Sequence, residues 1–161
     1  MNVDYAMRLA LLCLEGRTDF FGNPAILHAI HAANLAKTEQ EICCTLLYCA
    51  INDGKLCLSD VTILRDTDPD VWDVLKPMGH DIGLEGPFER IRDYDDEDLQ
   101  PVMVAVAQNH LLAREDEGIK CILSMVQDGD NGSLRLNQVK DYVTDIRRCL
   151  KALQATPAIE L

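Results

Sequence analysis

TEQEICCTLLYCAINDG, residues 38–54, is the stretch that decides the fold of this 161-residue chain. Thr38 followed three residues later by Glu41 is a capping box, a pattern typical of the start of a helix. Gly54 is the residue type that most often ends one. The ten residues from Ile42 to Ile51 are apolar except for Thr45, and a helix that is apolar all round is buried. We therefore predict a central helix here, with other helices packed around it.

Two helices are expected before this central element. Apolar residues at helical spacing predict a first helix that ends at Gly16; they are Val3, Met7, Ala10 and Leu14. A loop follows, and Asn23 can cap a second helix that has Pro24 in its first turn.

Further helices are expected after it. Ser59 and Asp68-Pro69 mark two starts, the second leading to Pro77, and glycines 79, 83 and 86 predict a loop. Pro87 is expected to open a short helix that runs through Ile91.

The C-terminal half is also helical in pattern. The acidic residues 95–98 precede a helix carrying Val102 to Leu111, where their charge complements the helix dipole. A separate helix is predicted over residues 119–126, and a long amphipathic one over residues 139–153. The turn between them, residues 128–132, is similar to a calcium loop but has glutamine where the first and last acidic ligands belong. The sequence predicts an all-α fold: one compact domain, residues 1–161, of about seven to nine helices.

Charge and composition exclude several classes of function. Fifteen Lys and Arg against 27 Asp and Glu give a net charge of −12, which repels nucleic acids and anionic lipids. The longest apolar run is about half the ~18 residues of a membrane span, and no basic leader precedes it. Seven cysteines without a C-x-x-C pair indicate reduced thiols in a cytoplasmic protein.

Polar and reactive side chains gather on the predicted helices. Tyr48, Cys49, Asn52 and Asp53 form two i, i+4 pairs on adjacent rows of the central helix. Buried polar groups cost free energy unless something pairs with them, so this cluster is a candidate site. His28 lies on the preceding helix, three residues before His31.

Two segments carry a resemblance to a known family. GRTDFFGNPAILH, residues 16–28, resembles the G-Q-x-D-K-x-G-x-P-Y-I-x-H segment of RelA/SpoT-type alarmone hydrolases, and TLLYCAINDG, residues 45–54, resembles their A-L-L-H-D-x-x-E-D-T segment. Residues 101–109 stand where their K-L-A-D-x-x-x-N segment would lie. The similarity spans residues 4–112 and leaves the C-terminal helices, residues 113–161, outside it. It implies the all-α HD fold.

The resemblance also implies a metal site, most of which is missing from this chain. The family's ligands are a first histidine, a His-Asp pair and a later aspartate, followed by a Glu-Asp pair that handles the attacking water. Of the four ligands only the histidine is kept, as His28. In the Glu-Asp pair Asn52 has lost the charge and Asp53 remains, and the two phosphate-binding lysines are Phe20 and Met103. We predict a degenerate pocket without metal, in a regulatory or protein-interaction module; the pocket residues are His28, Tyr48, Cys49, Asn52, Asp53 and Val106.

Two alternatives stay open beside this prediction. His28, Cys49 and His110, one helical turn beyond Val106, offer a nitrogen and sulfur ligand set suited to zinc, or to another divalent metal such as manganese, in a phosphohydrolase. The other is a noncatalytic sensor that binds a nucleotide. For the preferred interaction module the expected partner is another protein. The acidic residues 93–98 and 115–117 offer a surface to a partner protein that is basic. The same runs also fit a solvated face and helix caps, and the oligomeric state is left open.

Overall fold

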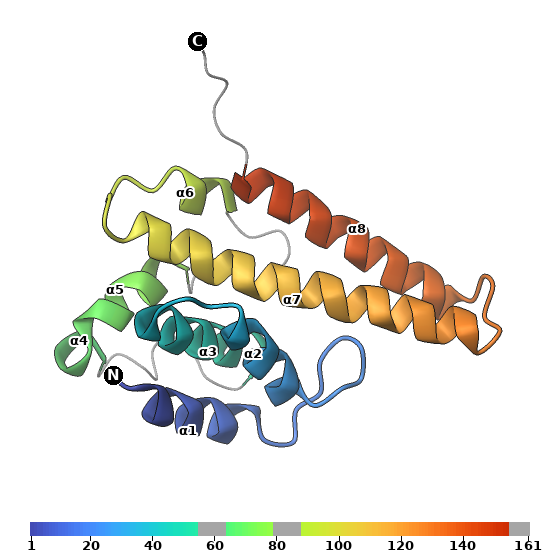
Figure 1. Cartoon of the computed structure of the whole chain (residues 1–161), viewed down its shortest axis with the longest axis horizontal. Helices are drawn as coiled ribbons and strands as arrows, with labels where there is room; N and C mark the ends of the chain where they lie inside the picture. The colour runs from blue at the N-terminus through green and yellow to red at the C-terminus, as the bar shows by residue number, and fades with distance from the viewer. Residues whose placement is uncertain (55–63, 79–87, 155–161) are drawn as a thin grey trace, which may run out of the picture.

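The structure is a computed structural model that describes residues 1–54, 64–78 and 88–154 (Figure 1). Eight helices make up this part of the chain, which confirms the predicted all-α class, and no strand occurs within the described ranges. The helices are α1 (Val3–Leu14), α2 (Ala25–Asn34), α3 (Glu39–Asp53), α4 (Leu64–Thr67), α5 (Pro69–Met78), α6 (Phe88–Arg92), α7 (Gln100–Gln127) and α8 (Leu134–Gln154).

Helix α3 is the central element, as its apolar composition predicts. It packs against α1, α2, α5 and α7, and every residue from Cys43 to Ile51 is buried. The Thr38 hydroxyl accepts a hydrogen bond from the Glu41 backbone N–H at 3.1 Å, so the predicted N-cap is present. At the other end Arg17 donates to the carbonyl oxygens of Asp53 and Gly54, where a cation also meets the negative end of the helix dipole.

Gly54 ends α3, but not by adopting the left-handed conformation for which glycine is usually found at this position. Its φ is −107°, outside the left-handed region. A Cβ at this position would lie 2.3 Å from the carbonyl oxygen of Ala50 and 3.0 Å from that of Cys13. The glycine is therefore required because a side chain here would collide first with the backbone of α3 itself and then with that of α1.

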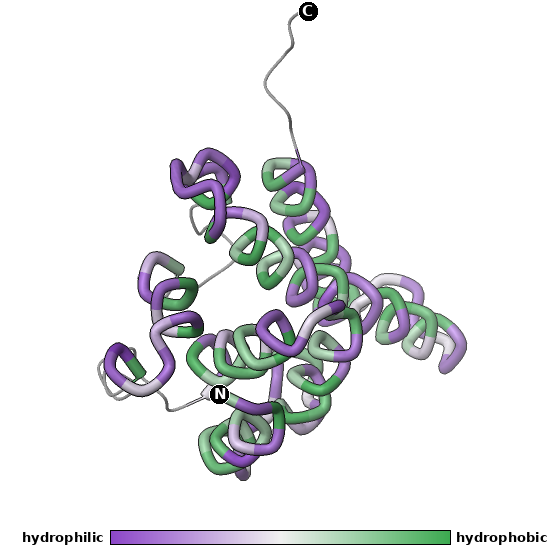
Figure 2. The backbone as a smooth tube through the Cα atoms, turned by 60° about the vertical axis from the view of Figure 1, so that its left-hand side comes forward, coloured by the Kyte–Doolittle hydropathy of each residue, from purple (hydrophilic) through white to green (hydrophobic). Residues whose placement is uncertain are grey.

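Helices α7 and α8 form a long antiparallel hairpin that lies across the shorter helices (Figure 1). The prediction of two separate helices in place of α7 was wrong, since one helix of 28 residues runs through both patterns. Gly118 sits inside it because α8 comes very close: a Cβ there would lie 2.4 Å from Cγ2 of Val143. Both helices alternate between hydrophobic and hydrophilic residues along the tube in Figure 2.

The predicted turns and caps hold with one exception. Asp130 accepts hydrogen bonds from the backbone N–H groups of Gly132 and Ser133, so residues 128–132 form a turn before α8. Asp96 accepts two backbone N–H bonds just before α7. Asn23 does not cap α2: Pro24 is the residue before the first turn, and the Asn23 N–H donates to Asp19. The predicted start at Ser59, the loop at glycines 79–86 and Pro87 lie outside the described residues.

None of the described helices combines the length and hydropathy that crossing a bilayer requires. No disulfide joins the cysteines of the described residues.

Candidate functional site

The three residues of the nitrogen and sulfur ligand set meet inside the bundle. His28 comes from α2, Cys49 from α3 and His110 from α7, and all three are at most 4% exposed. Their ligand atoms lie within 4.8 Å of one another. Nε2 of His28 is 2.9 Å from Nδ1 of His110, and Sγ of Cys49 is 3.9 Å from the same nitrogen. We call these three residues the His–Cys–His cluster.

Small residues let the three helices come this close. The face of α2 that carries His28 is otherwise built of buried alanines at positions 25, 29, 32 and 33. On α7, His110 continues the buried row that begins with Met103, Val106 and Ala107. The imidazoles therefore fill the space between backbones that alanine brings together, and their ring planes meet edge to face at 84°.

A chain of hydrogen bonds fixes where the imidazole protons lie. Both carboxylate oxygens of Glu117 are within 2.9 Å of Nδ1 of His28, so this nitrogen is the donor. Nε2 of neutral His28 is then an acceptor, and Nδ1–H of His110 donates to it. Nε2 of His110 accepts in turn from the amide of Asn52 at 3.4 Å. Both imidazoles are satisfied in the neutral form.

Burial controls the ionisation of the cluster. It lowers the pKa of His110 well below the ordinary histidine value, and the neighbouring charges of His28 and Arg114 lower it further. It also lowers the pKa of His28, again helped by Arg114. Burial raises the pKa of the Cys49 thiol and of the Tyr48 phenol. At neutral pH the cluster therefore holds two neutral imidazoles and a protonated thiol.

Arg114 forms a second layer beside the cluster. Its guanidinium, 2% exposed, donates to the Asp53 carboxylate and lies 3.4 Å from Glu117 and 3.6 Å from Asp19. Burial raises the pKa of Asp53, while the arginine opposes this effect. One cation thus joins three carboxylates from the α1–α2 loop, α3 and α7.

The remaining predicted pocket residues also lie here. The Tyr48 ring stands edge to face with His110, at 5.3 Å between centroids. Asn52 donates to His110 and to Asp53. Val106 is fully buried. His31 lies outside the cluster, with Nδ1 3.0 Å from Glu117.

Glu117, Arg114 and Asp19 are site residues that sequence reasoning missed. His110, Arg114 and Glu117 are spaced i, i+4, i+7 on one face of α7, a signal that appears only if α7 is continuous. The acidic run 115–117, which the sequence offers as a surface to a basic partner, already has partners within the chain. Glu115 pairs with Arg147, Asp116 with Lys120, and Glu117 points into the site.

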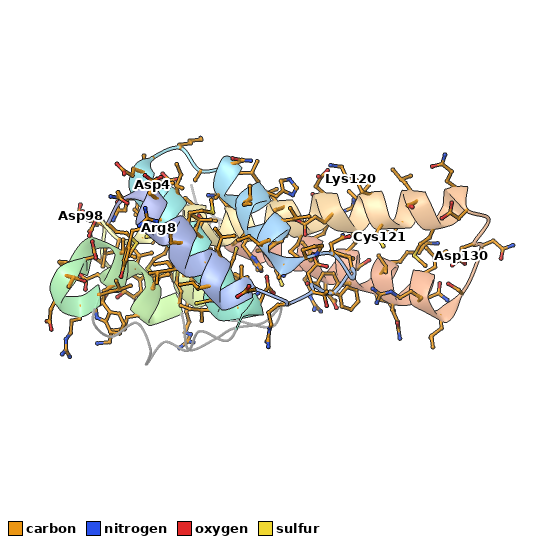
Figure 3. All side chains as sticks on the ribbon, turned by 90° about the horizontal axis from the view of Figure 1, so that it is seen from below. Asp4, Arg8, Asp98, Lys120, Cys121 and Asp130 are labelled. Atoms are coloured by element: carbon orange, nitrogen blue, oxygen red, sulfur yellow. The ribbon has the colours of Figure 1, made fainter. Side chains whose placement is uncertain are left out.

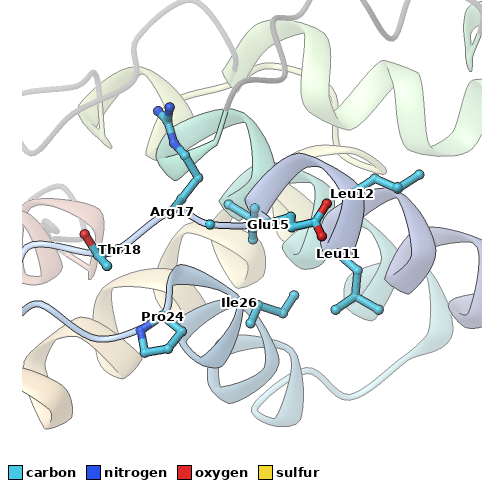
Figure 4. Close-up of a pocket in the computed structure, with 9 residues that line it drawn as sticks. Leu11, Leu12, Glu15, Arg17, Thr18, Pro24 and Ile26 are labelled. Atoms are coloured by element: carbon cyan, nitrogen blue, oxygen red, sulfur yellow. The ribbon is translucent and has the colours of Figure 1, made fainter.

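The His–Cys–His cluster has almost no contact with solvent, since its three side chains are buried. Cavities of about 570, 450 and 370 Å³ lie among the described residues, and none of them is lined by a residue of the cluster; the 370 Å³ cavity is lined in part by Glu117, the hydrogen-bond partner of His28. The largest is a groove between α1 and the start of α2 (Figure 4). Leu11 and Ile26 lie on its two sides, and Arg17 and Glu15 mark its polar edge.

Comparison with known proteins adds no family: no protein-family profile matches the chain, and a search of curated proteins finds no significant match. The resemblance to alarmone hydrolases therefore stays a prediction.

Proposed function

We propose that this chain is a noncatalytic helical module, a degenerate relative of the HD-domain hydrolases, that acts in the cytoplasm by binding another protein. The observation that carries the proposal is the closure of the site. His28, Cys49 and His110 are buried and satisfied by one another, by Glu117 and by Asn52. A hydrolase needs a reactive centre that its substrate can reach, and none of the three cavities described above is lined by His28, Cys49 or His110.

The charges around the cluster also disfavour a polyphosphate substrate. Phosphate groups are held by arginine and lysine side chains free to pair with them. Arg114 is already shared among Asp53, Asp19 and Glu117. Met103 is buried, and Phe20 stacks on Tyr142 at 4.2 Å. The side chains at these two positions, which the resemblance assigns to lysines, pack against other residues and carry no charge.

The groove between α1 and α2 is the surface that best suits a protein partner. Its lining is mainly apolar, and Leu11 and Leu12 are 48% and 72% exposed beside it. Exposed apolar side chains around a concavity are typical of protein interfaces. With a net charge of −12, the chain favours a partner that carries basic groups around an apolar anchor.

The catalytic side of the proposal is tested by turnover. Purified protein is incubated with guanosine tetraphosphate, and separately with bis(p-nitrophenyl) phosphate, in the presence of zinc or manganese. We expect the same background rate from the wild type and from His28→Gln. Metal-dependent release of pyrophosphate or nitrophenol that His28→Gln abolishes would establish the phosphohydrolase instead.

Thermal unfolding distinguishes nucleotide sensing from the proposed function. A nucleotide at 100 times its Kd would add about 2.7 kcal/mol to the stability of the folded state. We expect no shift of Tm with guanine or adenine nucleotides. A saturable shift of Tm with one of them would show that the protein is a nucleotide sensor and not an interaction module.

The binding side is tested by photo-crosslinking in the native cells. A photoreactive residue is placed at position 12 in the groove, or at Leu134, 76% exposed on the far end of the hairpin. We expect one discrete adduct from position 12, lost when Leu11→Glu is added, and none from position 134. Equal labelling from both positions, or none from position 12, would contradict the proposal.

A further inference from the structure

We propose that His28, Cys49 and His110 bind a zinc ion that ties α2, α3 and α7 together. The ion is a structural one, so this inference goes beyond the proposed function and holds with or without a protein partner. It rests on four properties of the cluster: the spacing of the ligand atoms, the hydrogen bonds behind them, the balance of charge and the type of donor.

The spacing of the ligand atoms is close to that around zinc. Tetrahedral zinc, with bonds of about 2.0 Å to nitrogen and 2.3 Å to sulfur, separates two nitrogens by about 3.3 Å and nitrogen from sulfur by about 3.5 Å. The nitrogens of His28 and His110 are 2.9 Å apart, and Sγ of Cys49 is 3.9 Å from His110. The third pair, Sγ of Cys49 and Nε2 of His28, lies within 4.8 Å, so closing the three ligands around an ion takes side-chain shifts of up to about 1 Å.

Hydrogen bonds behind the ligands orient them as in known metal centres. A metal-binding histidine usually donates its other N–H to a carboxylate, which fixes the ring and raises its basicity. Glu117 does this for His28 and leaves Nε2 facing the cluster. His110 binds through Nδ1 once its proton moves to Nε2. The Nε2–H group then donates a hydrogen bond to the amide oxygen of Asn52, which reaches it by a turn of the amide, since the two groups are 3.4 Å apart.

The charges balance when the ion is bound. Zinc displaces the thiol proton of Cys49, which passes to solvent, and the imidazoles remain neutral. The two positive charges of the ion then meet the Cys49 thiolate and the Glu117 carboxylate, whose nearest oxygen is 2.8 Å from the His28 ring. Arg114 is left to Asp53 and Asp19. A buried ion is tolerated when its charge is compensated in this way.

The donor types select the metal. Two imidazoles and a thiolate are the ligands that zinc prefers, whereas magnesium, calcium and manganese prefer oxygen. The nearby carboxylates of Asp53 and Glu117 are occupied by Arg114 and His28. Three protein ligands leave the fourth position of the tetrahedron to a water molecule, an arrangement otherwise found in catalytic zinc sites; here the burial of all three ligands keeps substrates away from it.

Metal content and cobalt spectroscopy test the site in the full-length protein. We expect about one equivalent of zinc in protein purified without chelator. After the metal is removed, cobalt(II) should bind with a thiolate-to-cobalt charge-transfer band and with the strong visible bands of tetrahedral cobalt. Zinc at 100 times its Kd should raise the Tm of the metal-free protein by about 5 to 10 °C.

Matched variants assign the signal to the cluster. Cys44→Ala serves as the control for Cys49→Ala, because both cysteines are fully buried on α3. His31→Gln is the control for His28→Gln on α2. We expect the cobalt charge-transfer band to disappear in Cys49→Ala, and cobalt binding to fall at least tenfold in His28→Gln, while both controls behave as the wild type.

Two results would overturn the inference, and neither bears on the turnover assay above. One is wild-type protein that takes up neither zinc nor cobalt and shows no change of Tm. The other is a cobalt spectrum that survives in Cys49→Ala, which would place the ion elsewhere. Since the wild-type measurements decide the first result, failure of a variant to fold leaves the test intact.

Discussion

Arg114 is the single side chain whose loss we expect to destabilise the protein most. Removing it in Arg114→Met leaves the carboxylates of Asp53, Asp19 and Glu117 close together without a cation. Breaking a buried ion pair on one side costs about 3–5 kcal/mol of unfolding free energy. Urea denaturation of the variant should give a loss in this range.

Arg147→Met is the control for that measurement. Arg147 pairs with Glu115 at 2.8 Å, but its side chain is 59% exposed. Exposed pairs contribute about 1 kcal/mol or less. Equal losses for the two variants would show that burial of the Arg114 network adds no stability.

His110 makes the metal-free protein sensitive to acid. Its pKa in the folded state lies well below 6.5, so the unfolded chain binds a proton that the folded one does not. The stability from neutral His110 is complete above pH 6.5 and is lost as the pH falls below it, by up to about 1.4 kcal/mol per pH unit. Chemical unfolding of chelator-treated protein between pH 7 and 5 measures this slope. If His110→Gln has the same dependence of unfolding free energy on pH as the wild type, the prediction is wrong.

At the scale of elements, the contact of α7 with α8 depends on Gly118. Alanine favours a helix over glycine by about 1 kcal/mol, but here its Cβ would meet Val143 at 2.4 Å. Overpacking of this kind costs about 1–3 kcal/mol, so Gly118→Ala should lower the unfolding free energy. The double variant with Val143→Ala should recover part of the loss. Gly132→Ala, with open space around its Cβ, is the neutral comparison.

The sequence predicts the elements better than their contacts. The Thr38 capping box and the apolar run behind it are local signals, so α3 and its central position follow from them. The division of α7 into two helices was wrong because residues 112–118 carry charge and a glycine. Only the tertiary structure brings Arg147 of α8 to Glu115 and Val143 to Gly118, whereas the pair of Asp116 with Lys120 is a local i, i+4 contact within α7. The same error hid Arg114 and Glu117, whereas His28 and Cys49 are named from the positions that the family resemblance gives to metal ligands, and His110 from its place one helical turn beyond Val106.

For the whole molecule, the α7–α8 hairpin divides the chain into a packed body and a projecting end. The end of α7 and the start of α8 extend beyond the other helices, with Cys121 and Asp130 far from Asp98 (Figure 3). Leu123, Val126 and Leu134 on this end are at least half exposed. Few buried contacts make a segment open more often. Hydrogen exchange should therefore be slowest in α3 and fastest in residues 122–137; uniform protection along α7 would contradict this.

The burial of the cysteines on α3 has a consequence for how the protein tolerates oxygen. Reagents and oxidants attack the thiolate, and burial raises the pKa of Cys44 to about 12 and also raises that of Cys43. Among the described residues, alkylation by iodoacetamide should begin at the two partly exposed cysteines, Cys13 at the end of α1 and Cys121 on the projecting end. Covalent dimers that form in air through Cys121 would join two molecules by these ends and leave the buried thiols of α3 untouched.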